Sequence, residues 1–434
     1  MTPKDGDIGE RFIKTLLPGR VQEECEYKNK RRMNMPVVSI RKTENHDYES
    51  IRAAVRQVVA DLGGLDDIIK PGYKVLLNPN FVAVPGDRCS GGVTRWEVVK
   101  AVAELVKEAG ATPIVAESAA AGVKTEEVIQ ACGYQEAMRD EGYEVLDLKK
   151  QKSCKIPVEG GKIISEMMTW EVVRDADAII TLPVMKTHDQ TEVTLGLKNL
   201  KGLIADGQKK TFHTLGVVPG VIDIIQTVKP VLNIIDGTYG QQGLGPIFGE
   251  TVEMKLIVGS KDVVAADAVT SAIMGYDVNE PMLTVEAYSR GLGEKDLDKI
   301  EVVGETIESV YHRFKRANEV EIEGLPPYTL LFDEGACTGC RNTVISALMD
   351  LKAGGYAHYL EGKYVVVGPL KELPPEATPE NTVLVGRCAN IHLKGRGREV
   401  KGCPPGNVFV VQGIVGDAET VGRRYSDQDE SSIQ

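Results

Sequence analysis

The amino-acid sequence predicts an α/β fold with a mostly parallel sheet covered by helices on both faces, followed by a smaller C-terminal α/β domain. Short apolar stretches alternate with helical stretches along most of the 434 residues, which is typical of strands buried on both sides. A chain of this length holds two domains, or three at most, at ~100–200 residues each. The segment IEGLPPY, residues 322–328, interrupts the alternation with turn-forming glycine and proline.

Strands and helices are expected in alternating order. The strands are expected at residues 36–42, 73–80, 112–118, 175–188, 231–240 and 254–262. Residues 50–62 carry apolar side chains at helical spacing and end at two glycines. Residues 94–109 are also helical in spacing, with Thr94 and Glu97 placed as a capping box. The chain therefore divides into an N-terminal extension at 1–35, an α/β domain at 36–325, a C-terminal domain at 326–415 and a tail at 416–434.

Composition argues against several classes of protein. The formal net charge of −12 provides no general basic field for binding nucleic acid. The sequence has no run of ~18 apolar residues that would span a membrane, and its start lacks the apolar core of a secretory signal. We therefore expect a cytoplasmic location. Eight cysteines in such a chain are not expected to form a disulfide framework, because cytoplasmic thiols stay reduced.

Polar side chains follow most of the predicted strands. In an open parallel sheet, ligands bind beyond the carboxyl ends of the strands. The polar residues at these ends are Asn78, Asn80, Glu117, Ser118, Lys186, Thr187, His188, Asp236, Lys261 and Asp262. If the sheet is parallel, these groups share one rim, and we predict a ligand site there.

The densest part of this rim is KTHDQTEVTLGLKNLKGLIADGQKKTFH, residues 186–213. Its lysines suit a carboxylate or phosphate, and its histidines could transfer protons or bind a metal. The predicted catalytic residues are Lys186, His188 and His213. The residues predicted to bind an anionic substrate are Asn80, Thr94, Glu117, Lys198, Asn199 and Asp236. Lys209 and Lys210 are expected to be solvated in a surface loop, and the sequence has no P-loop and no dinucleotide-binding glycine motif.

Several sequence blocks resemble the domain-of-unknown-function 362 family. They include NPNFV, VTRWEVVKAVAELVKEAGA, LPVMKTHDQTEVTLGLKNLKG, FHTLG and IIDGTYGQQGLGP. The resemblance covers about residues 70–276, and the KTH…TLGLKNLKG block is its most specific part. The family has no settled general reaction and is often associated with iron–sulfur domains. A looser likeness to nickel-pincer lactate racemases transfers no catalytic residues.

Four of the eight cysteines gather in the last quarter of the chain. Cys337 and Cys340 form CTGC after one predicted strand, and Cys388 and Cys403 follow two other strands. Three strand-end loops can therefore bring four thiolates to one edge of a small sheet. Four thiolates suit an iron–sulfur cube or a structural zinc, whereas a redox dithiol needs only the CTGC pair.

Residues 329–412 resemble the proximal-cluster site of nickel–iron hydrogenase small subunits, with a CTGC pair, a GRCA element and a GCPP loop at shorter spacing. The resemblance implies that one [4Fe–4S] cluster is held by Cys337, Cys340, Cys388 and Cys403. A negatively charged cluster also suits the cations around these cysteines, which are Arg387, Lys394, Arg396, Arg398 and Lys401.

These observations predict an iron–sulfur protein, either a redox enzyme or an electron-transfer component, that binds an anionic small molecule at the rim. A redox partner protein is expected, because one cluster moves one electron at a time, and a homo-oligomer is compatible with the sequence. Two alternatives stay open. A hydro-lyase or isomerase would use a metal as a Lewis acid, and an assembly protein would carry a cluster or metal for delivery.

Overall fold

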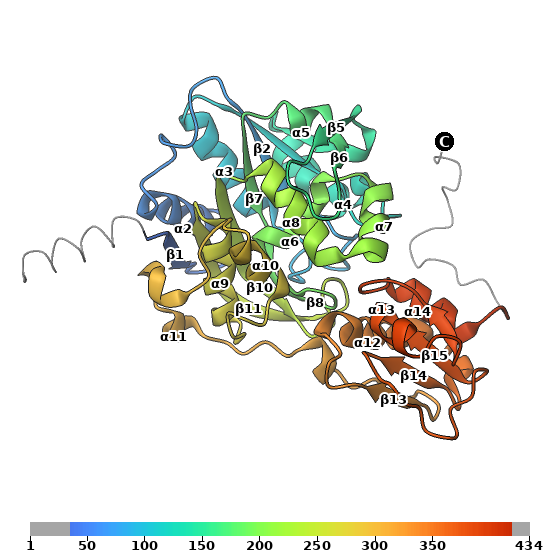
Figure 1. The fold of residues 1–434 in the computed structure, drawn as a ribbon. Coiled ribbons are helices and arrows are strands. Elements are labelled where there is room, and N and C mark those ends of the chain that lie inside the picture. Colours follow the sequence, from blue (N-terminus) through green and yellow to red (C-terminus); the bar gives the residue numbers. More distant parts are fainter. Residues whose placement is uncertain (1–34, 419–434) are drawn as a thin grey trace, which may run out of the picture.

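The computed structural model describes residues 35–418. The predicted N-terminal extension at 1–35 and tail at 416–434 lie almost entirely outside this range, as does Cys25. Figure 1 shows a larger α/β domain with a smaller one packed against one side of it. No helix in the described range is long and apolar enough to cross a membrane.

The larger domain is built on a ten-stranded sheet. The strands of its main path are, in spatial order, β12 (Glu301–Gly304), β1 (Val37–Lys42), β11 (Glu250–Ser260), β10 (Leu232–Gln242), β7 (Ala178–Leu182), β2 (Lys74–Pro79), β3 (Thr112–Glu117) and β4 (Glu144–Asp147). Two further strands, β8 (Val184–His188) and β9 (Glu192–Thr194), extend from β10. Neighbours on the main path are parallel except around β11, which runs antiparallel to β1 and β10. The predicted mostly parallel sheet is therefore confirmed.

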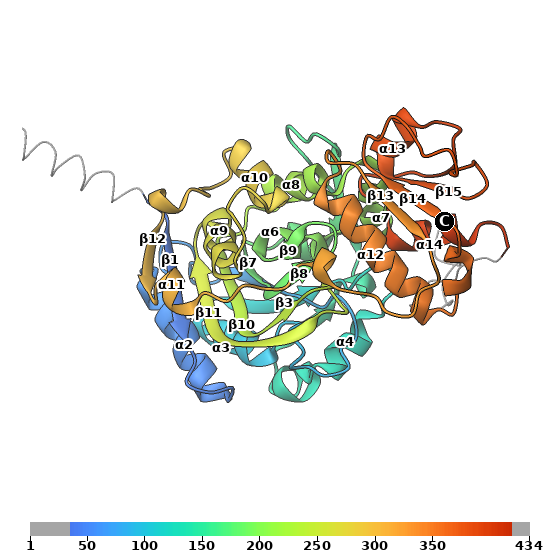
Figure 2. The same ribbon diagram turned by 90° about the horizontal axis from the view of Figure 1, so that it is seen from below.

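Helices cover both faces of this sheet, as predicted. One face is covered by α2 (Tyr48–Asp61), α3 (Trp96–Glu108) and α4 (Thr125–Ala131). The other is covered by α6 (Gly196–Asn199), α7 (Asp206–Leu215), α8 (Val217–Val228), α9 (Val263–Ile273) and α10 (Met282–Ser289). In Figure 2, α2 and α3 lie below the sheet, and α8 and α10 lie above it. Successive side chains of a strand point to opposite faces, so Val75 and Leu77 join the first core and Leu76 joins the second.

The larger domain also contains a short strand pair and two short helices. A separate antiparallel pair is formed by β5 (Ser153–Pro157) and β6 (Glu166–Trp170). Single-turn helices occur at α5 (Glu171–Arg174) and α11 (Ile307–Val310). These elements lie outside the two long helical layers.

The direction of β11 corrects one expectation about the rim. Ser260, at the end of β11, pairs with Asn233 near the start of β10. Lys261 and Asp262 therefore leave the sheet at the edge opposite to the predicted rim, where Lys261 forms an ion pair with Asp67 at 2.6 Å. The prediction that these two residues share the rim is wrong, because it assumed a parallel strand.

The predicted capping box at α3 is also wrong. The hydroxyl of Thr94 donates to Leu182 O at 2.7 Å, and Arg95 is the residue that precedes the helix. Glu97 pairs instead with Arg95 and Arg88, at 2.6 and 2.9 Å. Thr94 thus ties the start of α3 to the sheet rather than capping the helix.

The smaller domain has its own parallel sheet, in the order β13 (Thr329–Phe332), β14 (Tyr364–Val367), β15 (Thr382–Val385) and β16 (Arg398–Val400). Its first face packs against α12 (Thr338–Ala353) and α14 (Asn407–Val415), and its second against α13 (Gly386–His392). The predicted boundary at residues 325–326 falls between β12 and β13.

The two domains meet where β8 and α7 approach α12 and α14, as both views show (Figures 1 and 2). Ser346 Oγ on α12 donates to Asp189 Oδ2 at 3.0 Å, just beyond β8. Gln190 Nε2 donates to Pro405 O at 3.2 Å, just before α14. These contacts bring the rim of the larger sheet against the smaller domain.

The packing of β2 gives a direct test of this fold. Leu77 is fully buried between the sheet and its helices. We expect Leu77→Ala to lower the free energy of unfolding by about 2–5 kcal/mol, because it leaves a cavity in the core. Urea unfolding monitored by circular dichroism measures the change. Leu215→Ala is the control, because Leu215 is 47% exposed and should change the unfolding free energy by no more than about 0.5 kcal/mol. Equal effects of the two substitutions would contradict the packing.

Candidate functional site

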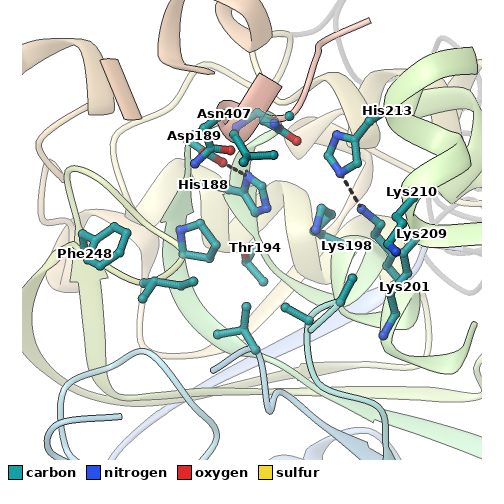
Figure 3. Close-up of a pocket in the computed structure, with 18 of the residues that line it drawn as sticks. His188, Asp189, Thr194, Lys198, Lys201, Lys209, Lys210, His213, Phe248 and Asn407 are labelled. Atoms are coloured by element: carbon teal, nitrogen blue, oxygen red, sulfur yellow. Dashed lines mark hydrogen bonds and ion pairs between the residues drawn. The ribbon is translucent and has the colours of Figure 1, made fainter. Parts of the chain in front are cut away.

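A cavity of about 370 Å³ lies between the two domains. Six of the nine predicted catalytic and substrate-binding residues line it, namely Asn80, Glu117, His188, Lys198, Asn199 and His213. The smaller domain closes it with side chains around α14, including Asn407 and Phe409. Figure 3 shows His188 and Asn407 facing the same space as Lys198 and His213. The predicted rim is therefore one wall of a pocket whose other wall comes from the second domain.

The lysines reach the cavity because a short helical segment is held at both its start and its apolar side. Asp267 accepts hydrogen bonds from Gly196 N and Leu197 N at 2.8 and 2.9 Å, which fixes the start of α6. Leu197 and Leu200 are fully buried in the core. Residues one position further along, Lys198 and Lys201, are then turned to the cavity.

Lys186, a predicted catalytic residue, lies behind the cavity wall. Its Nζ donates to Asn80 Oδ1 at 2.9 Å, to Gly92 O at 2.5 Å and to Pro246 O at 3.2 Å. All three acceptors are uncharged, and burial followed by the charge of Lys198 holds the pKa of Lys186 well below its usual value. Lys186 therefore positions Asn80 and has no donor left for a ligand.

Asn80 and Asn199 form a ladder of amides along the wall. Asn80 Nδ2 donates to Asn199 Oδ1 at 2.9 Å, and Asn199 Nδ2 donates to Asn78 O at 2.8 Å. Both side chains are buried, so these hydrogen bonds fix their orientation. The ladder holds α6 against the end of β2.

Two predicted substrate-binding residues, Thr94 and Asp236, do not line the cavity. Both are fully buried. The carboxylate of Asp236 accepts from Arg95 N at 2.9 Å and from Thr238 Oγ1 at 2.7 Å. Asp236 thus joins β10 to the start of α3, whereas Thr94 joins the start of α3 to the end of β7.

Lys198, Lys201 and His213 share the floor of the cavity. The Nζ of Lys201 lies 3.4 Å from His213 Nε2. The pKa of Lys198 is lowered to about 8, chiefly by burial and also by Lys209. Burial and then the neighbouring cations Lys201 and Lys198 hold the pKa of His213 well below its usual value, and burial and Lys198 do the same to the pKa of Lys201. Because each charge is poorly solvated and repelled by its neighbours, a bound anion would stabilise all three.

His188 is also held neutral near pH 7. Burial, followed by the charge of Lys198, lowers the pKa of His188 to about 4. Its Nδ1 accepts a hydrogen bond from Gln190 N at 2.9 Å and lies 2.9 Å from Asp189 Oδ1. These two contacts suit opposite tautomers of the neutral ring. With the proton on Nε2, Nδ1 accepts from Gln190 N and Nε2 can donate at the cavity, whereas with the proton on Nδ1, the ring donates to Asp189 and Nε2 can accept.

Glu117 is the buried acid of the cavity. Its Oε2 has no hydrogen-bond partner within residues 35–418, and burial raises the pKa of its carboxyl to about 7. Gly202 leaves room for the side chain of Glu117, since a Cβ added at residue 202 would lie 2.0 Å from Glu117 Oε1. Only a glycine fits this close approach without displacing the acid.

Lys209 corrects another expectation from the sequence. Its Nζ is buried and donates to Ser118 O, Ser118 Oγ and Ala119 O at 2.7–2.8 Å, with Asp206 at 3.3 Å. The predicted solvated position is therefore wrong for Lys209, whereas Lys210 is exposed as expected. Asp206 and Lys209 stand three residues apart on α7, a spacing that could have signalled the pair. Lys201 lies in the predicted basic segment and lines the cavity, but it is not among the predicted site residues.

The four cysteines of the smaller domain lie beyond the carboxyl ends of three of its four strands, β13, β15 and β16. Cys337 precedes α12, and Cys340 lies in its first turn. Cys388 is exposed on α13, and Cys403 follows β16. A hydrogen bond between the two thiols lowers the pKa of Cys337 to about 6, and the same bond, burial and the charges of the other three cysteines raise the pKa of Cys340. The four sulfurs therefore act on one another electrostatically.

Four thiolates suit either an iron–sulfur cluster or a structural zinc. Between residues 35 and 418, no three His, Cys, Asp or Glu side chains are arranged to hold one metal ion. Gly386 allows the loops to converge, because a Cβ there would lie 2.7 Å from Cys340 Sγ.

The cysteine loops contact the wall of the cavity directly. Cys403 N donates to His213 O at 3.0 Å, and Val217 N donates to Cys403 O at 3.2 Å. Thr338, next to Cys337, donates a short hydrogen bond to Glu192 on β9. The thiols and the cationic pocket are thus neighbours across the domain interface.

The raised pKa of Glu117 has a measurable consequence for stability. The folded protein holds this proton up to about pH 7, whereas the ordinary pKa of a glutamate carboxyl is 4.5. The wild-type protein should therefore lose up to about 3 kcal/mol of unfolding free energy, relative to Glu117→Gln, as the pH rises from 4.5 to 7. Urea unfolding of both proteins across this range measures the difference. Glu136→Gln, at an exposed position, keeps Glu117 and should follow the wild-type profile, and parallel profiles for Glu117→Gln and wild type would contradict the assignment.

Comparison with known proteins places the larger domain in a family. Residues 75–272 match the model described as "Domain of unknown function (DUF362)". A thylakoid-associated protein of Synechocystis sp. is 32% identical over 257 residues, which span 55% of this chain and 75% of that protein. The lactate racemase apoprotein from Thermoanaerobacterium thermosaccharolyticum aligns over 76% of this chain and 68% of its own, at 10% identity and a TM-score of 0.37, a likeness that concerns the fold alone. The chain belongs to the DUF362 family.

Proposed function

We propose that this chain is an iron–sulfur redox protein that passes electrons between a partner protein and an anionic small molecule bound in the interdomain pocket. The hydrogen bond from Cys403 N to His213 O carries the proposal. It puts a residue of the four-thiol site in direct contact with a residue of the cationic pocket. Such proximity suits electron transfer between a redox centre and a bound ligand.

The four thiols, Cys337, Cys340, Cys388 and Cys403, would hold a [4Fe–4S] cluster, which supplies one-electron transfer when bound. Four cysteine ligands leave no iron free to bind a substrate. This donor set therefore favours electron transfer over the hydro-lyase or isomerase alternative, which needs an open metal position.

Different pocket residues would bind the ligand and transfer protons. Lys198 and Lys201 would bind the anion, and His188 would donate a hydrogen bond from Nε2. A negative ligand stabilises the protonated forms of His188 and His213 and so raises their pKa values. The negative charge of the bound ligand thus makes both histidines easier to protonate, so that they can take up protons when the ligand is reduced.

The surface beside the thiols suits an acidic partner protein. Arg387 and Lys401 are exposed close to Cys388 and Cys403 in the sequence, and Lys394 and Arg396 are exposed on the turn between α13 and β16, although the chain as a whole carries a net charge of −12. Cys388 and Cys403 are themselves exposed. We propose that a small acidic one-electron carrier docks on this cationic surface, because complementary charge speeds such encounters. A cytoplasmic location and a homo-oligomer stay predictions.

Metal and sulfide analysis tests the cluster. Protein purified without oxygen should contain about four irons and four sulfides per chain. Cys388→Ala should lose both together, along with the electron paramagnetic resonance signal of the dithionite-reduced protein. Cys154→Ala is the matched control, because Cys154 lies on β5 in the larger domain.

Two other results would redirect the proposal. One zinc and no sulfide would show that the four cysteines form a structural zinc site and would leave the pocket alone as the functional site. A cluster that falls apart whenever it is reduced would favour a role in cluster delivery.

The cationic surface has its own test. With a reduced plant-type ferredoxin as the acidic probe, Lys394→Glu with Arg396→Glu should slow cluster reduction at least about tenfold at low ionic strength. The difference should shrink at high salt, which screens exposed charges. Lys42→Glu with Lys70→Glu, on exposed parts of the larger domain, is the control. If both double variants behave like the wild type in stopped-flow measurements, the carrier docks elsewhere.

A further inference from the structure

The interdomain cavity has two chemically different halves. Figure 3 shows Lys198, Lys201 and His213 on one side and Phe248 on the other. Phe248 follows β10 in the larger domain and is 42% exposed, and Phe409 on α14 of the smaller domain is 50% exposed. Both side chains line the same cavity, and apolar surface gathered in one groove is typical of a binding site. The cavity therefore offers charge at one end and apolar surface at the other.

From this geometry we propose that the ligand is a carboxylate with an apolar body, its head at Lys198 and Lys201 and its body against Phe248 and Phe409. The proposal rests on the proposed function only in using the same pocket. It goes further by naming the chemical class of the ligand.

The head of the ligand is indicated by unused polar groups. Glu117 Oε2 and His213 Nδ1 are buried without a hydrogen-bond partner in the described part of the chain. Native proteins rarely leave such atoms unpaired unless a ligand or water completes them. No carboxylate lies within ion-pair distance of Lys198 or Lys201 among the described ion pairs, so both ammonium groups are open to a ligand oxyanion.

The charge of the cavity favours a carboxylate over a doubly charged head such as phosphate. Asp189 also lines the cavity and opposes excess negative charge. The cations are themselves partly suppressed by burial and mutual repulsion. A singly charged head is therefore matched better than a dianion.

The body of the ligand is indicated by the rest of the lining. Val82, Ile247 and Val411 add apolar surface beside the two phenylalanines. A volume of about 370 Å³ is suited to a small organic molecule. Because Phe248 and Phe409 come from different domains, a bound apolar body would contact both domains at once.

Isothermal titration calorimetry on the full chain with a series of carboxylates tests the proposal. Acetate, butanoate, hexanoate and octanoate share one head and differ only in apolar length. We expect the affinity to rise roughly threefold to fourfold per added methylene until the cavity is filled. Phe248→Ala should weaken octanoate about tenfold and leave acetate unchanged, while Lys198→Met should weaken every member. Tyr311→Ala is the control, because Tyr311 is 54% exposed and does not line the cavity.

The outcomes separate this inference from the proposed function. An affinity that does not depend on chain length, or inorganic phosphate bound as tightly as octanoate, overturns the ligand class. So does a chain-length effect that survives both Phe248→Ala and Lys198→Met, since this would show binding elsewhere on the protein. Phe248 is exposed, so its substitution remains informative even if Lys198→Met fails to fold. Iron and sulfide content of the same preparations tests the cluster independently, so either conclusion can fail while the other stands.

Discussion

The pairing of the GCPP loop with the junction between α7 and α8 is the contact on which both sites depend. Cys403 N donates to His213 O, and Cys403 O accepts from Val217 N, so the loop is held through both the N–H and the C=O of Cys403. This fit requires Gly402, whose φ is +145° and whose added Cβ would lie 2.7 Å from His213 O. One short loop thus sets the position of a thiol and closes the wall of the anion pocket. A change in domain packing would alter both sites together.

The second constraint is the burial of positive charge. Lys198 and Lys201 are directed inward because Leu197 and Leu200 fill the core behind them and Asp267 fixes the start of their helix. Removing charged groups from water costs free energy that hydrogen bonds and packing elsewhere must offset. Perturbed lysines, histidines and acids collected in a cavity are typical of functional sites, because purely structural burial would pair each charge. Lys186 shows the contrast, with all three of its protons given to fixed neutral acceptors.

The sequence predicted the elements of this site better than their contacts. Alternating strands and helices located the parallel sheet, and the strand-end rule found Asn80, Glu117 and the lysine block because β2, β3 and β7 are parallel. The same rule failed for Lys261, since nothing local reveals that β11 runs the other way. Thr94, Lys186 and Lys209 were misjudged because the reach of a side chain into a wall or a cavity is decided by tertiary packing. The apolar wall could not be predicted at all, since Phe409 comes from another domain.

The extent of the family match shows how the pocket is divided along the chain. The matched segment, residues 75–272, contains the cationic floor, both histidines and Phe248. The four thiols and Phe409 come from the smaller domain, beyond that segment. A chain reduced to the matched segment would keep the charges that hold an anion but would have a cavity open on one side. The smaller domain therefore adds two things at once, four thiols and a surface that closes the apolar side of the cavity. Because the thiol loop is hydrogen-bonded to the pocket wall, the position of the thiols and the closure of the cavity depend on the same interface. The proposed transfer of electrons to an enclosed ligand requires such an arrangement.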